Sequence, residues 1–204
     1  MKQLFIFPRN GNGIEALDCI DDEYDFLGFI DDNHTTFKND DYPVFGRDAI
    51  NKYGEVSILA VPGNSNNFLK RYRIISSLGI PNHRFANVIH KSAKIGKNVK
   101  LGYNILIMAG SVLTSNVLLG DHNVILPNSV IHHDVQIGSK TIIGSNVVIA
   151  GNTILGENCY IGSGATIINS IRIGDKTLVG MGSNVVNSFK GEQIIFGNPA
   201  KKKH

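Results

Sequence analysis

Residues 131–151 read IHHDVQIGSKTIIGSNVVIAG, and an aliphatic side chain recurs in this stretch at every sixth position, from Ile131 to Ile149. The same spacing continues in both directions without a failed step, so that sixteen residues share one register. We call these residues the anchors: Ile95, Leu101, Ile107, Leu113, Leu119, Ile125, Ile131, Ile137, Ile143, Ile149, Leu155, Ile161, Ile167, Ile173, Val179 and Val185.

A six-residue period matches neither the turn of a helix nor the alternation of a strand. A fixed short repeat is typical of a solenoid, in which each unit buries its apolar face only against its neighbours. The spacing predicts a coil with three flat sides of six residues each. The second position before each anchor is mostly small or β-branched, as a tight corner requires, with Asn123 as the polar exception.

Glycine follows the anchor in nine repeats, where we expect it to supply turns that need a positive φ. These glycines are Gly96, Gly102, Gly120, Gly138, Gly144, Gly156, Gly162, Gly174 and Gly180.

Length and composition bound the remaining possibilities. The chain has 204 residues, and its formal net charge of +3 equals the contribution of three lysines, 201–203, in its tail. The rest is close to neutral, so we predict no nucleic-acid-binding surface. Cys19 and Cys159 lie far apart without metal-ligand spacing, which suits a reducing cytosol. The absence of a long apolar run predicts a cytoplasmic protein that is not inserted in a membrane.

The first half of the chain alternates between apolar runs and segments with helical spacing. We predict strands at 2–7, 26–30, 56–61 and 85–89, and helices near 14–20, 48–53 and 67–78. This order predicts a small, Rossmann-like, doubly wound parallel sheet. The chain thus divides into an α/β domain at 1–88 and an all-β coil domain at 89–204 that includes the C-terminal tail.

A glycine-containing loop lies between the first predicted strand and helix. Gly11, Gly13 and Ala16 fit the pattern G-x-G-x-x-A, and Asp31 follows at the end of the next strand. In nucleotide-binding sheets such glycines let the backbone approach a phosphate, and the acid accepts from a ribose hydroxyl. The two glycines are equally compatible with an ordinary tight turn. Asp31 and Asp32 could likewise be solvated residues at the end of a strand, where their side chains cap a turn. The predicted α/β domain is about the size of one mononucleotide-binding half and is too small for a full dinucleotide domain, which favours a nucleotide-sugar over NAD as its ligand.

One corner of the predicted coil carries the sequence His132-His133-Asp134. A histidine followed by a carboxylate on a rigid corner has the parts of a general base and a partner that orients it and raises its pKa. One coil later, Gly151 would leave room for a substrate beside the imidazole and a backbone N–H for a developing oxyanion. We therefore predict His133 as the base. His132 competes with it, but directly follows an anchor and is expected to face an adjacent chain.

The other histidines are less informative. His122 fills a turn position, where we expect a solvated or an interface role. Some solenoids of this kind hold zinc with three histidines between chains, but His122, His132 and His133 lack an i, i+5 pairing, and no metal is predicted.

The six-residue repeats resemble those of hexapeptide-repeat acyltransferases, which fold as left-handed parallel β-helices. The ending Gly197-Asn198-Pro199-Ala200-Lys201 is similar to one that many of them share. The small nucleotide-binding-like domain and the segment Ile131-His132-His133-Asp134 together resemble a narrower group, the sialic-acid O-acetyltransferase-like proteins and the bacillosamine and perosamine N-acetyltransferases.

The resemblance implies transfer of acetyl from acetyl-CoA to the amine of a nucleotide-linked amino-dideoxy-sugar, for surface glycan biosynthesis. It implies a homotrimer with active sites between chains and a catalytic pair at His133 and Asp134. The implied cosubstrate contacts are Gly151, Ser163, Gly180 and Met181, with Lys201 in a tail that fits either a phosphate contact or a solvated end. The implied nucleotide-sugar contacts are Gly11, Gly13, Asp31, Asp32 and Gly63.

Two alternatives remain open at this point. The acceptor could be a hydroxyl, as in O-acetylation of a sialic-acid-like sugar, which would demand a stronger base. The chain could also be a non-catalytic, nucleotide-sugar-binding trimer in which the coil only drives assembly. The sequence does not separate UDP, dTDP and GDP as the nucleotide.

Overall fold

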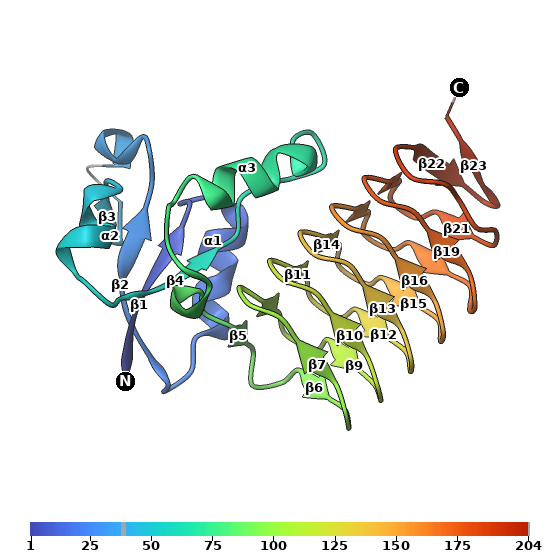
Figure 1. The fold of residues 1–204 in the computed structure, drawn as a ribbon, viewed down its shortest axis with the longest axis horizontal. Coiled ribbons are helices and arrows are strands. Elements are labelled where there is room, and N and C mark those ends of the chain that lie inside the picture. Colours follow the sequence, from blue (N-terminus) through green and yellow to red (C-terminus); the bar gives the residue numbers. More distant parts are fainter. Residues whose placement is uncertain (38–39, 204) are drawn as a thin grey trace.

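The structure, a computed structural model, describes residues 1–37 and 40–203 of the chain. An α/β part at the N-terminus is followed by a long coil of short strands that runs to the C-terminus (Figure 1). The α/β part holds a four-stranded parallel sheet in the order β3-β2-β1-β4. Its strands are β1 (Lys2–Phe7), β2 (Tyr24–Ile30), β3 (Val44–Phe45) and β4 (Ser57–Ala60). The predicted small parallel sheet is confirmed.

Short helices cover both faces of this sheet, because alternate residues of β1 enter different cores. Leu4 and Ile6 pack toward Ala16 and the coil, whereas Phe5 and Phe7 pack toward Ile50. The helices are α1 (Gly11–Glu15), α2 (Asp48–Lys52) and α3 (Arg71–Ser76), with the 3₁₀ segments η1 (Ala16–Cys19), η2 (His34–Phe37), η3 (Phe68–Lys70) and η4 (Asn82–Arg84). Within the described residues, no helix is both long and apolar enough to cross a membrane.

Two predictions about the strands were wrong. The two-residue strand β3 was missed, because so short a run carries no periodic signal. The predicted strand 85–89 does not join the first sheet as a unit. Phe85 makes only an isolated bridge to Ile58, while Val88–Ile89 forms β5 and pairs with the first complete coil.

The coil has three faces, each a parallel sheet of very short strands. The first face holds β5, β8 (Leu106–Ile107), β11 (Val124–Ile125), β14 (Ile142–Ile143), β17 (Tyr160–Ile161), β20 (Leu178–Val179) and β22 (Ile194–Gly197), followed by the antiparallel β23 (Ala200–Lys202). The second face holds β6 (Lys94–Ile95), β9 (Val112–Leu113), β12 (Val130–Ile131), β15 (Val148–Ile149), β18 (Thr166–Ile167) and β21 (Asn184–Val185). The third face holds β7 (Lys100–Leu101), β10 (Leu118–Leu119), β13 (Gln136–Ile137), β16 (Ile154–Leu155) and β19 (Arg172–Ile173).

The predicted register of eighteen residues per coil is confirmed, since Ile125 pairs with Ile143 and Ile131 with Ile149. From Ile107 to Val185 every anchor is at most 3% exposed, whereas Ile95 at the open end is 40% exposed. Burying each aliphatic side chain contributes about 1.5–3 kcal/mol, so the stack of anchors is the main core of the coil.

The reason that we gave for the nine glycines was wrong. Positive φ occurs two residues further on, at the third residue after the anchor, as at Asn116 (62°) and Asn152 (59°). The glycine after the anchor is needed instead because consecutive coils approach closely. A Cβ at Gly138 would lie 2.6 Å from the carbonyl carbon of Gly156.

The α/β part is seated on the first face of the coil. Leu106, Val124 and Ile142 point out of this face into the same core as Leu4 and Ile6. The edge strand β4 meets the side chain of Asn104, which is 1% exposed. Its Nδ2 donates to the Ala60 carbonyl (2.7 Å) and its Oδ1 accepts from the Ala60 N–H (2.7 Å), so one amide completes the hydrogen bonding of this edge.

Two further buried polar side chains lie at this junction. The fully buried Arg71 guanidinium donates to the carbonyls of Pro62 and His122. The His122 ring packs edge-on against Phe85, with 5.0 Å between ring centroids. Burial lowers the pKa of His122 to about 4, so the ring is neutral at pH 7. His122 is therefore not solvated as one prediction had it, but buried at the junction between the two parts of one chain.

Candidate active site

His133 and Asp134 form a hydrogen-bonded pair at the corner between the second and third faces. His133 Nδ1 lies 2.8 Å from Asp134 Oδ2. Hydrogen bonds from His133 and Asn116 hold the pKa of Asp134 below its ordinary value. The charged carboxylate therefore accepts the Nδ1–H, which leaves the lone pair of Nε2 available to take a proton. The His133 side chain is 58% exposed, so a ligand can reach it.

The backbone of this pair is fixed by the coils on both sides. Asp134 is the third residue after its anchor and has a φ of 59°. Its N–H donates to the Ser115 carbonyl (3.0 Å), and the His133 carbonyl accepts from the Asn152 N–H (3.0 Å). The pair thus sits on a rigid element rather than on a mobile loop.

Gly151 lies one coil beyond His133, as predicted. A Cβ placed there would be 2.6 Å from His133 Cε1 and 2.7 Å from Nε2, so only glycine leaves the ring its space. At four other corners the side chain at this position, the second after the anchor, accepts a hydrogen bond from the coil before, as when Ser163 Oγ accepts from the Ser145 N–H (3.1 Å). Among the described residues, neither the His133 N–H nor the Gly151 N–H has a protein acceptor. The N–H predicted to meet an oxyanion is therefore available.

Asn116 is a residue of this site that the sequence reasoning missed. Its Nδ2 donates to Asp134 Oδ1 (2.9 Å), and its own Oδ1 accepts from Asn98 Nδ2 (3.2 Å). The register of eighteen held a signal for it, because residues 98, 116 and 134 occupy equivalent positions in three successive coils. A groove of about 700 Å³ runs beside these side chains and is also lined by Leu118 and Gln136.

The other predicted cosubstrate residues lie elsewhere on the chain. Ser163, Gly180 and Met181 are at the corner between the first and second faces, so the whole second face separates them from His133. The Met181 side chain is 76% exposed. Lys201 is exposed on β23, in the hairpin with β22 that closes the last coil. One chain therefore does not bring these residues to its own His133.

The five predicted nucleotide-sugar residues follow the carboxyl ends of β1, β2 and β4, at one edge of the first sheet. The two glycines lie in the first turn of α1, and this turn is tied to the loop at Gly63, because Asn12 Nδ2 donates to the Gly63 carbonyl (3.4 Å). A Cβ on Gly13 would meet the Pro8 carbonyl oxygen at 2.5 Å, whereas one on Gly11 would meet nothing within 4 Å. Gly63 has a φ of 110° and packs on Arg71.

The two acids of this edge already have protein partners. Asp31 accepts from the N–H groups of Arg9 (3.1 Å) and Asn33 (2.8 Å), so it ties the loop between β1 and α1 to the end of β2 and caps a turn. Asp32 is held by a bidentate pair with Arg47, at 2.5 and 2.9 Å. Asp31 faces the loop between β1 and α1, and Asp32 is turned toward α2.

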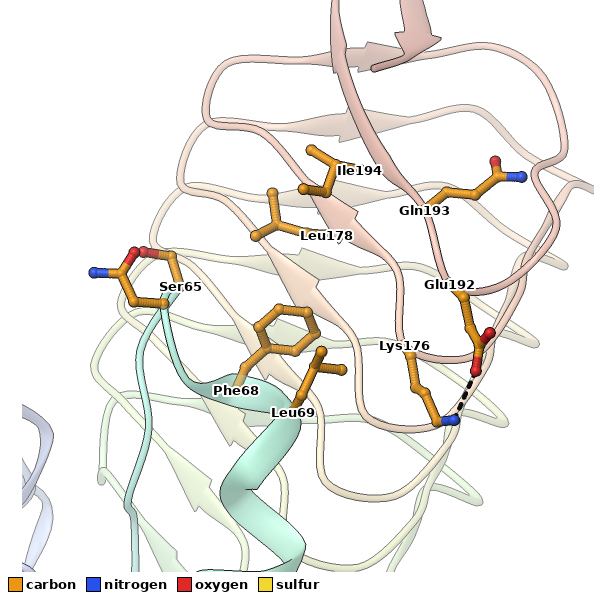
Figure 2. A pocket seen from close by; sticks show the side chains of 9 residues that line it. Ser65, Phe68, Leu69, Lys176, Leu178, Glu192, Gln193 and Ile194 are labelled. Carbon is orange, nitrogen blue, oxygen red and sulfur yellow. Dashed lines mark hydrogen bonds and ion pairs between the residues drawn. The ribbon is translucent and has the colours of Figure 1, made fainter. Parts of the chain in front are cut away.

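A separate cavity of about 510 Å³ lies between η3 and the C-terminal end of the first face. Figure 2 shows Phe68 and Leu69 facing Leu178, with the ion pair of Lys176 and Glu192 (2.7 Å) at the margin. This cavity contains none of the predicted site residues. In the described part of the chain, no group of three potential ligands could hold a metal ion.

Comparisons with known proteins agree with this architecture. The family model described as bacterial transferase hexapeptide (six repeats) matches residues 116–151 and 134–169. Comparison with curated protein sequences gives no match.

Several solved structures are similar over the whole length of the chain. PerB from Caulobacter crescentus, in complex with CoA and GDP-perosamine, is 26% identical with a TM-score of 0.84, covering 100% of this chain and 98% of that one. A histidine-to-alanine mutant of GDP-perosamine N-acetyltransferase from the same organism is 26% identical with a TM-score of 0.85, covering 100% and 97%. The acetyltransferase domain of PglB from Neisseria gonorrhoeae, in complex with acetyl coenzyme A, is 22% identical with a TM-score of 0.83 and shares the fold, covering 99% of each chain. The left-handed β-helix and the resemblance to hexapeptide-repeat sugar N-acetyltransferases are confirmed.

Proposed function

We propose that the chain is an acetyl-CoA-dependent N-acetyltransferase that acts on the amine of a nucleotide-linked amino-dideoxy-sugar. The observation that carries this proposal is the pair of His133 and Asp134, exposed on a rigid corner beside the gap at Gly151. The match along the full chain to an enzyme structure that holds CoA and GDP-perosamine supports the substrate class.

The geometry suits direct transfer without a covalent enzyme intermediate. The sugar amine attacks the thioester carbonyl carbon while His133 Nε2 accepts an amine proton. The charge of Asp134 stabilises the imidazolium that forms, and the Gly151 N–H donates to the oxyanion of the tetrahedral intermediate. When this intermediate collapses, the C–S bond breaks, and His133 returns the proton to the departing thiolate. The products are the amide and CoA.

The nucleotide is proposed to bind at the carboxyl edge of the first sheet. The first turn of α1, which contains Gly11 and Gly13, is joined there to the loop at Gly63, and Asp31 accepts from the Arg9 N–H just before this turn. These residues would meet the phosphates and the ribose. Asp32 could join them only by leaving Arg47.

Thiol release with acetyl-CoA and a panel of acceptors tests this function. We expect turnover with at least one GDP-, UDP- or dTDP-linked amino-dideoxy-sugar, and none with the matching sugar that carries a hydroxyl instead of the amine. Turnover of the hydroxyl sugars alone would make the chain an O-acetyltransferase. No turnover with any acceptor, despite binding of a nucleotide-sugar, would make it a binding protein.

The active site is proposed to form between the chains of a homotrimer. His133 and Gly151 lie at one edge of the second face, and Ser163 and Met181 at the other, so two copies are needed to place both sets on one acetyl-CoA. Val112, Val130 and Val148 form an apolar row that points out of this face. Such a row suits contact with another copy.

Mixed assemblies test this shared site. His133→Ala chains and Met181→Glu chains should each be inactive alone, because each lacks one half of every site. Assembled together in equal amounts, they should recover about a quarter of the wild-type activity, the share of interfaces in which both halves are intact. Light scattering checks the assembly. A monomeric wild type, or no recovery in mixed trimers, would contradict the shared site.

A further inference from the structure

Asn98, Asn116 and Asp134 form a ladder of side chains that ends on the proposed base. Each is the third residue after its anchor at the same corner, and their φ values are 59°, 62° and 59°. The hydrogen bonds run from Asn98 to Asn116 (3.2 Å), from Asn116 to Asp134 (2.9 Å) and between Asp134 and His133 (2.8 Å). Side chains of three coils are thereby linked to one imidazole.

We propose that Asn116 is a positioning residue, which holds the Asp134 carboxylate in the orientation that keeps the Nε2 lone pair of His133 directed at the substrate. The proposal rests on the proposed function. Both carboxylate oxygens are engaged, Oδ2 by His133 and Oδ1 by Asn116. A carboxylate held at both oxygens does not rotate, whereas one held only by the imidazole rotates about its side chain and takes the ring with it.

Asn98 extends this ladder by one coil. An amide has one donor end and one acceptor end, and the oxygen of Asn116 would repel the carboxylate, so Asp134 selects the orientation in which the Asn116 NH₂ group faces it. The other end of this amide, Oδ1, then accepts from Asn98 Nδ2. Asn98 thus supports Asn116 in this orientation.

A purely conformational reason for Asn116 must be separated from this role. Asparagine tolerates the left-handed backbone better than most residues, and Asn128 and Asn146 occupy the equivalent position at another corner, where they do not contact the pair. Glycine adopts this backbone without strain and occurs in the same position at Gly110 and Gly164. Asn116→Gly therefore removes the amide and leaves the corner intact.

The test compares Asn116→Gly with Asn146→Gly, which makes the same change at the equivalent position of a different corner, where φ is 56°. We expect Asn116→Gly to lower kcat about tenfold and to leave the KM of both substrates within about twofold, since only the alignment of the base is lost. Asn98→Gly should give a smaller loss of kcat. Asn146→Gly should match the wild type.

The ring tautomer of His133 gives a second readout. While Asp134 accepts from the Nδ1–H, the lone pair stays on Nε2, so in Asn116→Gly the ¹⁵N chemical shifts of the neutral ring should show a smaller share of the Nδ1–H tautomer. Wild-type ¹⁵N shifts together with a wild-type kcat would overturn the proposal. So would a higher KM with unchanged ¹⁵N shifts, because Asn116 would then contact the substrate. If the wild type transfers no acetyl group, the proposed function fails, and the ¹⁵N shifts still decide whether Asn116 positions the pair.

Discussion

Replacement of His133 by alanine should lower kcat/KM for acetyl transfer by about 10²- to 10⁴-fold, the range that a positioned general base contributes. An ammonium group cannot attack the thioester, and in the variant the acceptor amine has no nearby group to take its proton. Binding of CoA should persist, because the implied contacts of the cosubstrate are made largely by the backbone. Thiol release measures the activity, and calorimetry with CoA measures the binding.

His132→Ala is the matched control for this substitution. The His132 N–H donates to the Ile149 carbonyl (2.9 Å), a contact of the backbone that alanine keeps. We expect this variant to retain near-normal turnover. If His132→Ala were inactive and His133→Ala active, the assignment of the base would be reversed.

Replacement of Gly151 by alanine should lower kcat by roughly 10²-fold, the cost that a displacement of about 1 Å in a reacting group can carry. The new Cβ would lie 2.6 Å from His133 Cε1, so the ring must leave its place on Asp134. The backbone of Gly151 is not in the left-handed region, so alanine should not strain the backbone, and the clash with the ring is the only cost that we expect. Turnover and the melting temperature of the variant are the measurements.

A double-mutant cycle separates the contact from a general disturbance. Alanine at 151 should lower the melting temperature when His133 is present and should have little effect in His133→Ala, because the ring that it strikes is gone. Equal destabilisation in both backgrounds would show that the new methyl group disturbs the coil itself, and full activity of Gly151→Ala would show that the ring is not constrained there.

The coil and its catalytic corner were predictable because one periodicity governs both. Every sixth residue had to be aliphatic for the coils to stack, and eighteen residues separate His133 from Gly151. The same register contained the ladder at Asn98 and Asn116, but sequence reasoning missed it. Finding it required the knowledge that the third residue after the anchor adopts the left-handed backbone, whereas we had placed positive φ at the glycines.

The α/β part was predicted less completely, because its short elements carry weaker patterns. The edge strand β3 has only two residues, and the pair of Asp32 with Arg47 joins side chains fifteen residues apart that no periodic pattern connects. The junction with the coil was also missed. This junction depends on individual hydrogen bonds, such as those from Arg71 to the carbonyls of Pro62 and His122, and no sequence pattern connects such partners.

The contact between Asn104 and Ala60 has a consequence for how such proteins can diversify. An open edge strand offers unpaired N–H and C=O groups to any other extended chain, which is a common route to aggregation. Here the amide of Asn104 shields that edge, so the coil protects its own α/β part. A foreign α/β part brought in by recombination would keep this protection at its edge strand where the coil presents an amide at the same position.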